Sequence, residues 1–196
     1  MRLELTTDPR TSGVMSLATA NEAFSDLLDG NLGASWNRLA GGCEYRAHAA
    51  VARLAAYTSL VFKAWALPHI GLDGTEKRPL VPQRQIPDPT AGKFHTWAFH
   101  VAPAALVLDG AGRVSTMVFD PSLLDGPCAT KRWMWAMSAS DGRLLLTGPE
   151  VFLIDTRSLA YSKPPGDDVV AQNLAAQGKS PDAVVARLLA EVAHGK

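Results

Sequence analysis

The stretch FHTWAFHVAPAALVLDGAGRVSTMVFD, residues 94–120, decides the fold of this chain. Two runs rich in apolar and strand-favouring residues, 94–108 and 113–120, lie on either side of the turn sequence DGAG. Such runs on both sides of a short glycine-containing turn are typical of a β-hairpin. The sequence therefore predicts two antiparallel strands that occupy most of this stretch.

The register of this hairpin determines which side chains share a face of the sheet. A three-residue loop pairs Leu108 with Gly112, and counting along both strands then places His100 directly opposite Asp120. Directly opposed residues have Cβ atoms about 4.5–5.5 Å apart, which lets an imidazole donate to a carboxylate. A two-residue loop would place the two side chains on opposite faces. The three-residue loop is therefore the prediction that brings His100 to Asp120.

A helix is predicted over CEYRAHAAVARLAA, residues 43–56, directly after two glycines. Cys43 would be its first residue, where unpaired backbone N–H groups and the helix dipole favour a thiolate over a thiol. The chain order Cys43, His100 and Asp120 suits a nucleophile, a base and an orienting carboxylate. Helical spacing also predicts an inward-facing stripe made of Cys43, Ala47, Ala50, Val51 and Leu54.

The other segments predict helices before and after the strands. We expect a first helix over 14–28 and a C-terminal helix over 183–192, and the proline-rich segment 69–92 is either a flap beside the site or an ordinary surface loop. This order of elements predicts one α+β domain over residues 1–196, with the Cys43 helix packed on an antiparallel sheet. The further strands expected are 60–67, 131–137 and 151–154.

Composition argues against several classes of protein. The 196 residues are 47% hydrophobic, and 19 basic and 19 acidic residues give a net charge of zero without the basic cluster of a nucleic-acid-binding protein. No stretch approaches the length of an apolar membrane span, and the N-terminus lacks the apolar region of a signal peptide. The histidines and the two cysteines lack metal-ligand spacing, so neither a metal nor another cofactor is expected. We expect a protein that is cytoplasmic or delivered by a non-classical secretion route.

Three short segments together resemble the bacterial protein-glutaminases, a group of transglutaminase-like cysteine enzymes. The resemblance implies a transglutaminase- or papain-like fold and a catalytic triad. In that triad Cys43 is the nucleophile, His100 the general base and acid, and Asp120 the orienting acid. The segments that carry the resemblance are GCEYRAH at 42–48, WAFHVA at 97–102 and FDPSL at 119–123.

The resemblance implies hydrolysis of a glutamine side-chain amide, in a protein or peptide substrate, through a thioester on Cys43. The backbone N–H of Cys43 is the expected oxyanion donor. Three alternatives remain open: transfer of the acyl group to an amine, as in a transglutaminase, cleavage of a peptide bond, and a catalytically silent binding module on the same scaffold. The oligomeric state is left open.

Several of these residues also have a purely structural interpretation. A lone cysteine such as Cys43 is more often a buried apolar residue than a nucleophile, and the triad rests on its joint placement with the histidine and aspartate. Arg46 and His48 belong to the matching segment but lie off the stripe of Cys43, so we expect structural roles for them. Trp133 and Trp135 would alternate onto one face of a strand and either line a substrate groove or pack in the core.

Overall fold

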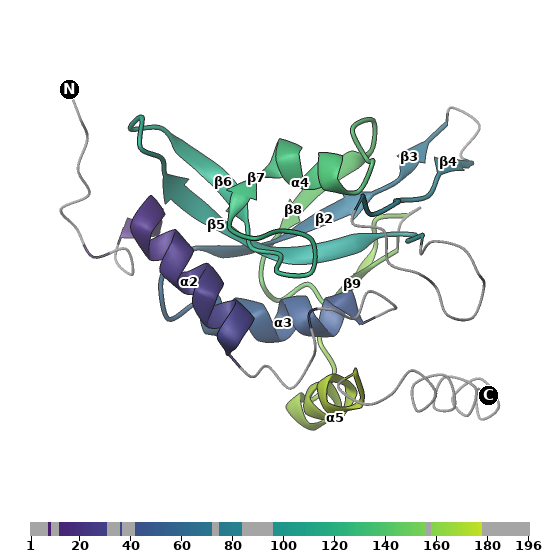
Figure 1. Ribbon diagram of the computed structural model, residues 1–196. Helices are drawn as coiled ribbons and strands as arrows, with labels where there is room; N and C mark the ends of the chain where they lie inside the picture. The colour runs from purple at the N-terminus through teal and green to yellow at the C-terminus, as the bar shows by residue number, and fades with distance from the viewer. Residues whose placement is uncertain are drawn as a thin grey trace.

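A six-stranded β-sheet lies at the centre of the structure (Figure 1). The computed structural model describes residues 8, 12–30, 36, 42–71, 75–83, 96–155 and 158–177. Neighbouring strands are antiparallel, except that β1 runs parallel to the end of β5. In sheet order the strands are β7 (Cys128–Ala129), β6 (Val114–Val118), β5 (His100–Leu108), β2 (Val61–Leu67) and β8 (Arg143–Thr147), with β1 (Val14–Ser16) beside β5.

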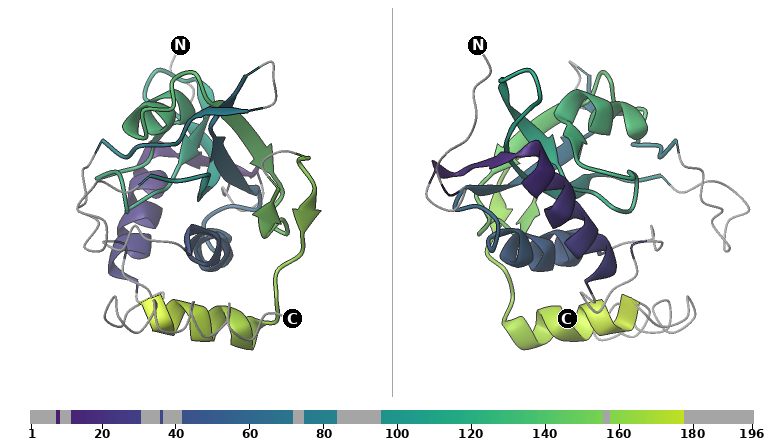
Figure 2. Two further views of the ribbon diagram at one scale, coloured as in Figure 1. Left: turned by 90° about the vertical axis from the view of Figure 1, so that its right-hand side faces the viewer. Right: turned by 60° about the vertical axis from the view of Figure 1, so that its left-hand side comes forward.

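Helices cover both faces of this sheet. Helices α2 (Leu17–Asp29) and α3 (Cys43–Leu54) lie below it in Figure 1, and the short helix α4 (Thr130–Ala136) lies above it. Helix α5 (Asp167–Gln177) packs on α3 on the side away from the sheet (Figures 1 and 2). The architecture is therefore α+β, as predicted, with the helix that begins at Cys43 packed on a largely antiparallel sheet. Two small ladders complete it: β3 (His69–Ile70) with β4 (Glu76–Arg78), and β9 (Leu153–Ile154) with β10 (Tyr161–Ser162).

The hairpin of β5 and β6 is confirmed, but its predicted register is wrong by two residues. Leu108 pairs with Val114 instead of Gly112. The loop is closed by Asp109, whose backbone N–H donates to the carbonyl of Arg113 at 2.9 Å and whose carboxylate accepts from the Arg113 N–H at 2.9 Å. The loop closed by this pair comprises residues 110–112, and Gly112 at its end has a φ of 77°, the left-handed conformation that glycine adopts at little cost. Because side chains alternate with a period of two, the shift keeps His100 and Asp120 on one face and makes them diagonal neighbours.

The first predicted helix begins three residues later than expected. Residues Val14–Ser16 form β1 and pair with the end of β5, because Met15 is fully buried there. Ser16 then caps α2, and its hydroxyl accepts from the backbone N–H of Thr19 at 3.1 Å. A serine cap satisfies one of the unpaired N–H groups of the first turn and stabilises a helix by about 1 kcal/mol. The apolar pattern ran through both elements and hid this boundary.

The strand predicted at 131–137 is wrong, since the segment forms α4. Trp133, Met134 and Met137 are buried at helical spacing, whereas Trp135 is 61% exposed. The two tryptophans therefore point in different directions and do not share a face. A short, nearly continuous apolar run is compatible with a strand or a buried helix, so the sequence pattern alone did not distinguish them.

The other predicted segments are confirmed in part. The strand predicted at 60–67 is confirmed as β2, and the one at 151–154 shortens to β9. Segment 69–92 contains β3 and β4, and Leu80, two residues after β4, forms an antiparallel bridge with Trp97. Residues 72–74 and 84–95 lie outside the described residues. The helix predicted at 183–192 also lies outside them.

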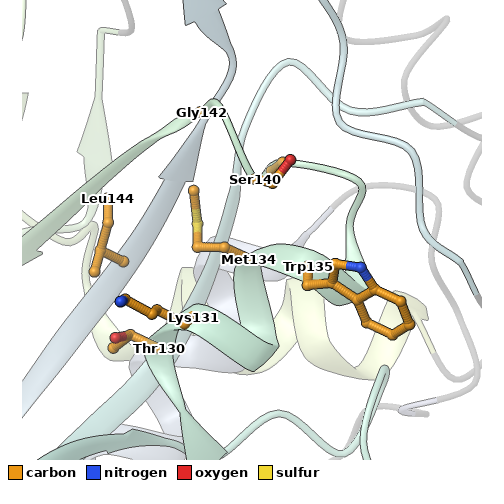
Figure 3. A pocket seen from close by; sticks show the side chains of 8 residues that line it. Thr130, Lys131, Met134, Trp135, Ser140, Gly142 and Leu144 are labelled. Atoms are coloured by element: carbon orange, nitrogen blue, oxygen red, sulfur yellow. The ribbon is translucent and has the colours of Figure 1, made fainter.

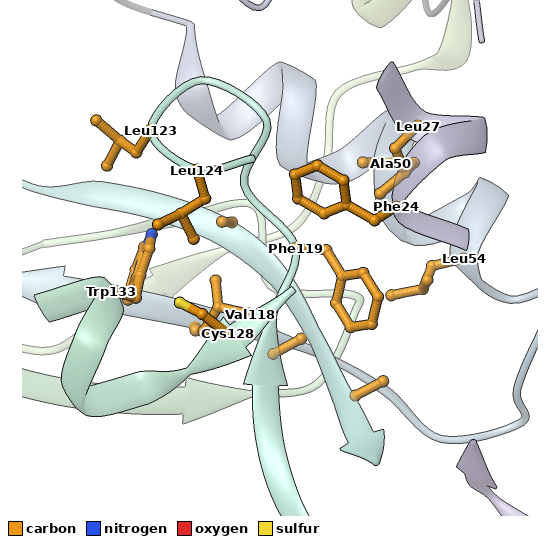
Figure 4. Close-up of a cluster of buried hydrophobic side chains, with 14 of the residues drawn as sticks. Phe24, Leu27, Ala50, Leu54, Val118, Phe119, Leu123, Leu124, Cys128 and Trp133 are labelled. Atoms are coloured by element: carbon orange, nitrogen blue, oxygen red, sulfur yellow. The ribbon is translucent and has the colours of Figure 1, made fainter. Parts of the chain in front are cut away.

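Small and large apolar side chains interlock between the sheet and its helices. The predicted stripe of α3 is confirmed, since Ala47, Ala50, Val51 and Leu54 are buried with Arg46 and Cys43 is half-buried. Small residues on α3 and on the facing strand β5 allow the helix backbone to approach the sheet closely. Figure 4 shows the part of this core that joins the helices to the hairpin, including Phe24, Leu27, Ala50, Leu54, Val118, Phe119, Leu123, Leu124, Cys128 and Trp133.

Lys63 is a fully buried charged side chain in the middle of β2. Its Nζ donates to the carbonyl oxygen of Val151 at 2.7 Å and lies 3.4 Å from Nδ1 of His48 on α3. Burial lowers the pKa of Lys63 to about 8, although the carboxylate of Glu150 acts in the opposite direction. Lys63 therefore links β2, α3 and the segment before β9 at the cost of a desolvated ammonium group.

Replacing Lys63 by methionine is expected to remove a pH dependence of stability. The folded chain releases the Lys63 proton near pH 8, whereas the unfolded chain keeps it up to about 10.5, so the unfolded state binds more protons in this window and stability rises with pH. Between pH 7 and 10, the free energy of unfolding of the wild type should rise relative to Lys63→Met by the order of 2 kcal/mol. Urea unfolding at several pH values measures this difference, and a constant offset would contradict it.

None of the helices in the described part of the chain is both long and apolar enough to span a membrane.

Candidate active site

Cys43 and His100 line one cavity at the start of β5. Cys43 enters it from the first turn of α3, and His100 from the first residue of β5. The cavity has a volume of about 300 Å³. The structure thus brings together two residues that are far apart in the sequence. The described residues that line it are Gly42, Cys43, Glu44, Thr96, Trp97, Ala98, Phe99 and His100.

His100 and Asp120 form a buried hydrogen-bonded pair. Nε2 of the imidazole lies 2.8 Å from Oδ2 of the carboxylate, and both side chains are almost completely buried. This bond engages Nε2 and leaves Nδ1 as the ring nitrogen that can exchange a proton with a group in the cavity. The predicted pairing of the two residues is confirmed, although through a diagonal register.

Three further donors hold the Asp120 carboxylate. Nε1 of Trp133 donates to Oδ2 at 2.8 Å, while the backbone N–H of Ser122 donates to Oδ1 at 3.1 Å and the Ser122 hydroxyl donates to the same oxygen. Burial by itself would raise the pKa of Asp120. The charge and hydrogen bond of His100, with the bonds from Ser122 and Trp133, outweigh it and hold the pKa below its ordinary value. The carboxylate is therefore ionised at neutral pH and fixed in direction.

Two tryptophans fix the plane of the His100 ring. The Trp97 ring stacks on it with centroids 4.5 Å apart and planes 17° apart, and the Trp133 ring lies 5.9 Å away. Trp97 is itself anchored through its backbone, because its N–H donates to Leu80 at 2.9 Å and its carbonyl accepts from Leu80 at 3.0 Å. The imidazole therefore cannot rotate away from Asp120 without displacing packed aromatic rings.

Gly42 lets the chain turn directly into α3, so that Cys43 is the first residue of the helix. Its φ of 71° is a left-handed conformation that glycine adopts at little cost, and its carbonyl accepts from the Arg46 N–H at 3.1 Å to start the helix. The N-terminal residues of a helix leave backbone N–H groups without helical partners. Cys43 thus lies in the turn of α3 whose backbone N–H groups have no helical partners.

The expected lowering of the thiol pKa is not found. Burial, with a smaller contribution from the Glu44 carboxylate whose Oε2 lies 3.5 Å from Sγ, raises the pKa of Cys43 to about 12. Arg46 and the backbone of Val101 act in the opposite direction without cancelling this effect. The prediction from helix position alone was wrong because desolvation and a neighbouring carboxylate outweigh the helix terminus. The resting site therefore holds a thiol.

Arg46 and His48 lie behind the cavity. Arg46 is buried, and its positive charge favours the ionised form of Cys43. His48 contacts the ring of Phe152, with centroids 5.8 Å apart, and approaches Lys63. Both residues lie outside the lining of the cavity, which agrees with the structural roles expected for them.

Sequence reasoning missed four residues that surround the cysteine, histidine and aspartate. Trp97 and Ser122 lie inside the matching segments, so their position next to His100 and Asp120 was an available signal. Glu44 directly follows the cysteine and received no role. Trp133 falls in the strand predicted at 131–137, and no local pattern indicates that its indole donates to Asp120, thirteen positions away.

A second hollow, of about 360 Å³, lies beside α4 (Figure 3). Trp135, Met134 and Leu144 contribute its apolar surface, and Lys131 adds a positive charge. It contains none of the predicted site residues. Among the residues that the structure describes, no group of three or more histidine, cysteine or acidic side chains could hold a metal ion.

Comparison with known proteins identifies the fold. The chain matches the NMR structure of protein-glutaminase from Chryseobacterium proteolyticum with a TM-score of 0.63 and 18% identity, covering 86% of this chain and 94% of that one. A crystal structure of protein-glutaminase matches with a TM-score of 0.65 and 18% identity, covering 86% of this chain and 91% of that one. A search of curated protein sequences found no match. The likeness to these structures shows a shared fold.

A longer protein, pro-protein-glutaminase, also matches this chain. The crystal structure of pro-protein-glutaminase has a TM-score of 0.65 and 18% identity, with 89% of this chain covered but only 61% of that chain. The family model described as glutaminase matches residues 20–137, which contain α3, the hairpin and α4. Since this match spans more than half of the chain, the protein belongs to the glutaminase family and is a glutamine-deamidating hydrolase.

Proposed function

We propose that Cys43, His100 and Asp120 form a catalytic triad that deamidates glutamine side chains in proteins or peptides. The observation that carries the proposal is the buried His100–Asp120 pair, whose imidazole lines the same cavity as the Cys43 thiol. A nucleophile, a base and a group that orients the base are the three parts that thiol acyl transfer needs. Solved structures with this fold are named protein-glutaminases, which supports protein-bound glutamine as the substrate class.

In the proposed reaction Sγ of Cys43 attacks the carbon of the glutamine amide while Nδ1 of His100 takes the thiol proton. The C–N bond then breaks, and the imidazolium returns the proton to the nitrogen, which leaves as ammonia and generates a thioester. Water attacks the thioester carbon and gives a proton to His100. The C–S bond breaks, the proton passes to the sulfur, and glutamate and the thiol are released.

The surroundings of Cys43 and Asp120 suit these reaction steps. Since the Cys43 pKa is about 12, a free thiolate is rare at neutral pH, and the proton must leave as the sulfur attacks. The ionised Asp120 carboxylate orients the imidazole and stabilises the imidazolium that forms. The oxyanion of the tetrahedral intermediate has a donor in the Cys43 backbone N–H at the start of α3.

A matched pair of peptides tests the reaction. The wild-type protein should release ammonia from an unfolded glutamine-containing peptide and raise its mass by about one dalton, as amide-to-acid conversion requires. The same peptide with asparagine in place of glutamine should react far more slowly. Incorporation of an added primary amine, with less glutamate formed than ammonia released, would indicate a transglutaminase. New peptide termini would indicate a peptidase. No modification of any glutamine substrate would contradict the proposal.

Replacing Trp133 by phenylalanine is expected to lower the deamidation rate about tenfold and the free energy of unfolding by about 1–2 kcal/mol. The variant keeps the aromatic packing but loses the N–H donor to the buried Asp120 carboxylate. Initial rates and urea unfolding measure the two effects. The matched control is Trp135→Phe, because Trp135 lies on the same helix with 61% of its surface exposed. Equal effects of the two substitutions would contradict a positioning role for Trp133.

A further inference from the structure

Glu44 places a carboxylate directly beside the nucleophile. It is the second residue of α3, it lines the cavity, and its Oε2 lies 3.5 Å from Sγ of Cys43. The proposed reaction does not use this group. A carboxylate there also opposes ionisation of the thiol, which indicates that Glu44 has a function other than activating Cys43.

Glu44 contributes a carboxylate to the wall of the cavity. Among the described lining residues it is the one carboxylate, and the others apart from His100 are neutral. His100 already faces the Asp120 carboxylate through Nε2. Among the described residues, no lysine or arginine lies within ion-pair distance of Glu44. A ligand that enters the cavity therefore meets the Glu44 carboxylate, while the buried Arg46 acts on Cys43 with the opposite sign.

We propose that Glu44 is a specificity-determining residue that makes this cavity select cationic over anionic ligands. On protein substrates it favours glutamines flanked by lysine or arginine and disfavours those flanked by aspartate or glutamate. This statement rests on the proposed function. Two unit charges separated by several ångströms near a protein surface attract or repel enough to change a rate several-fold.

The same charge assists product release. The reaction converts a neutral amide into a carboxylate inside the cavity, where Glu44 repels it. The substrate amide carries no such charge, so the repulsion disfavours the bound product relative to the bound substrate. The charge of the Glu44 carboxylate thus disfavours the product relative to the substrate. The same charge favours substrates with basic neighbours over substrates with acidic neighbours.

Charged thiol reagents test the selection without requiring catalysis. Methanethiosulfonates with an ethylammonium, an ethylsulfonate or a neutral methyl group modify the same sulfur, and peptide mapping separates Cys43 from Cys128. In the wild type, the cationic reagent should modify Cys43 about tenfold faster than the anionic one, relative to neutral controls of equal intrinsic reactivity. In Glu44→Gln this ratio should fall to about twofold or less, and Glu44→Asp should keep an intermediate ratio. An unchanged ratio in Glu44→Gln would overturn the proposal.

Glu22→Gln is the matched control for loss of one negative charge. Glu22 lies on α2 and acts on Tyr57, which follows the opposite end of α3 from Cys43. It should leave the reagent ratio unchanged. The pH profile of alkylation by neutral iodoacetamide adds a second readout, because Glu44→Gln should shift it to lower pH and a purely structural role would not.

Peptides then extend the test to substrates. The wild type should deamidate a Lys-Gln-Lys peptide about tenfold more efficiently than a Glu-Gln-Glu peptide, and Glu44→Gln should reduce this preference to about twofold. Equal preference in both proteins would overturn the inference while leaving the proposed function intact. Absence of ammonia from every peptide would instead contradict the proposed function, and the reagent ratio would still decide whether Glu44 controls charge selection in the cavity.

Discussion

Replacing Cys43 by alanine is expected to lower glutamine-dependent ammonia release by at least about 10⁴-fold, to the background of the assay. The substitution removes the sulfur that would form the thioester in the proposed reaction, and no other thiol lines the cavity in the described part of the chain. His100 and Asp120 keep their hydrogen bond, but without a nucleophile they can only assist water. Ammonia release and mass mapping of the substrate measure the effect.

The control for Cys43→Ala is Cys128→Ala. Cys128 is a free, buried cysteine of β7 that packs in the core near Trp133 (Figure 4). Its loss should cost about 1 kcal/mol of stability through a small cavity and should leave the deamidation rate within about twofold. Retention of activity in Cys43→Ala, or its loss in Cys128→Ala with an intact fold, would contradict the assignment of Cys43 as nucleophile.

Replacing Asp120 by asparagine is expected to lower the deamidation rate by about 10³- to 10⁴-fold, the size seen when the orienting acid of a comparable triad becomes an amide. The carboxylate accepts from Nε2 of His100 and thereby directs Nδ1 toward proton exchange. An amide in its place loses the negative charge that stabilises the imidazolium. Rates with the glutamine peptide measure the loss, and circular dichroism verifies the fold. A rate within tenfold of the wild type would contradict the role.

Asp120→Asn should also change how stability depends on pH. The folded pKa of Asp120 is lowered, so its ionised form stabilises the folded state above the unfolded pKa of about 3.8, and this contribution is lost as the pH falls through the folded value. The wild type should therefore be more stable than the variant at neutral pH and approach it in acid. The difference at pH 7 compared with pH 3 is the measurement. A difference independent of pH would indicate lost packing instead of lost charge.

The sequence by itself determined the main elements around the site, because their signals are local. Helical spacing of small residues after two glycines defined α3 and its buried stripe, and a glycine-containing turn between apolar runs defined the hairpin. The side-chain period of two then kept His100 and Asp120 on one face even though the predicted register was wrong by two residues. Short matching segments identified Cys43, His100 and Asp120.

Only the tertiary structure decided how these groups are held and charged. The indole of Trp133 reaches Asp120 because α4 forms as a helix, and the local pattern did not distinguish this helix from a strand. The state of the Cys43 thiol depends on burial and on Glu44, whose combined effect outweighs the helix terminus that the sequence revealed. Desolvation and through-space charge are properties of the assembled fold. A sequence pattern can therefore locate a candidate nucleophile, while its protonation state follows from what the fold packs around it.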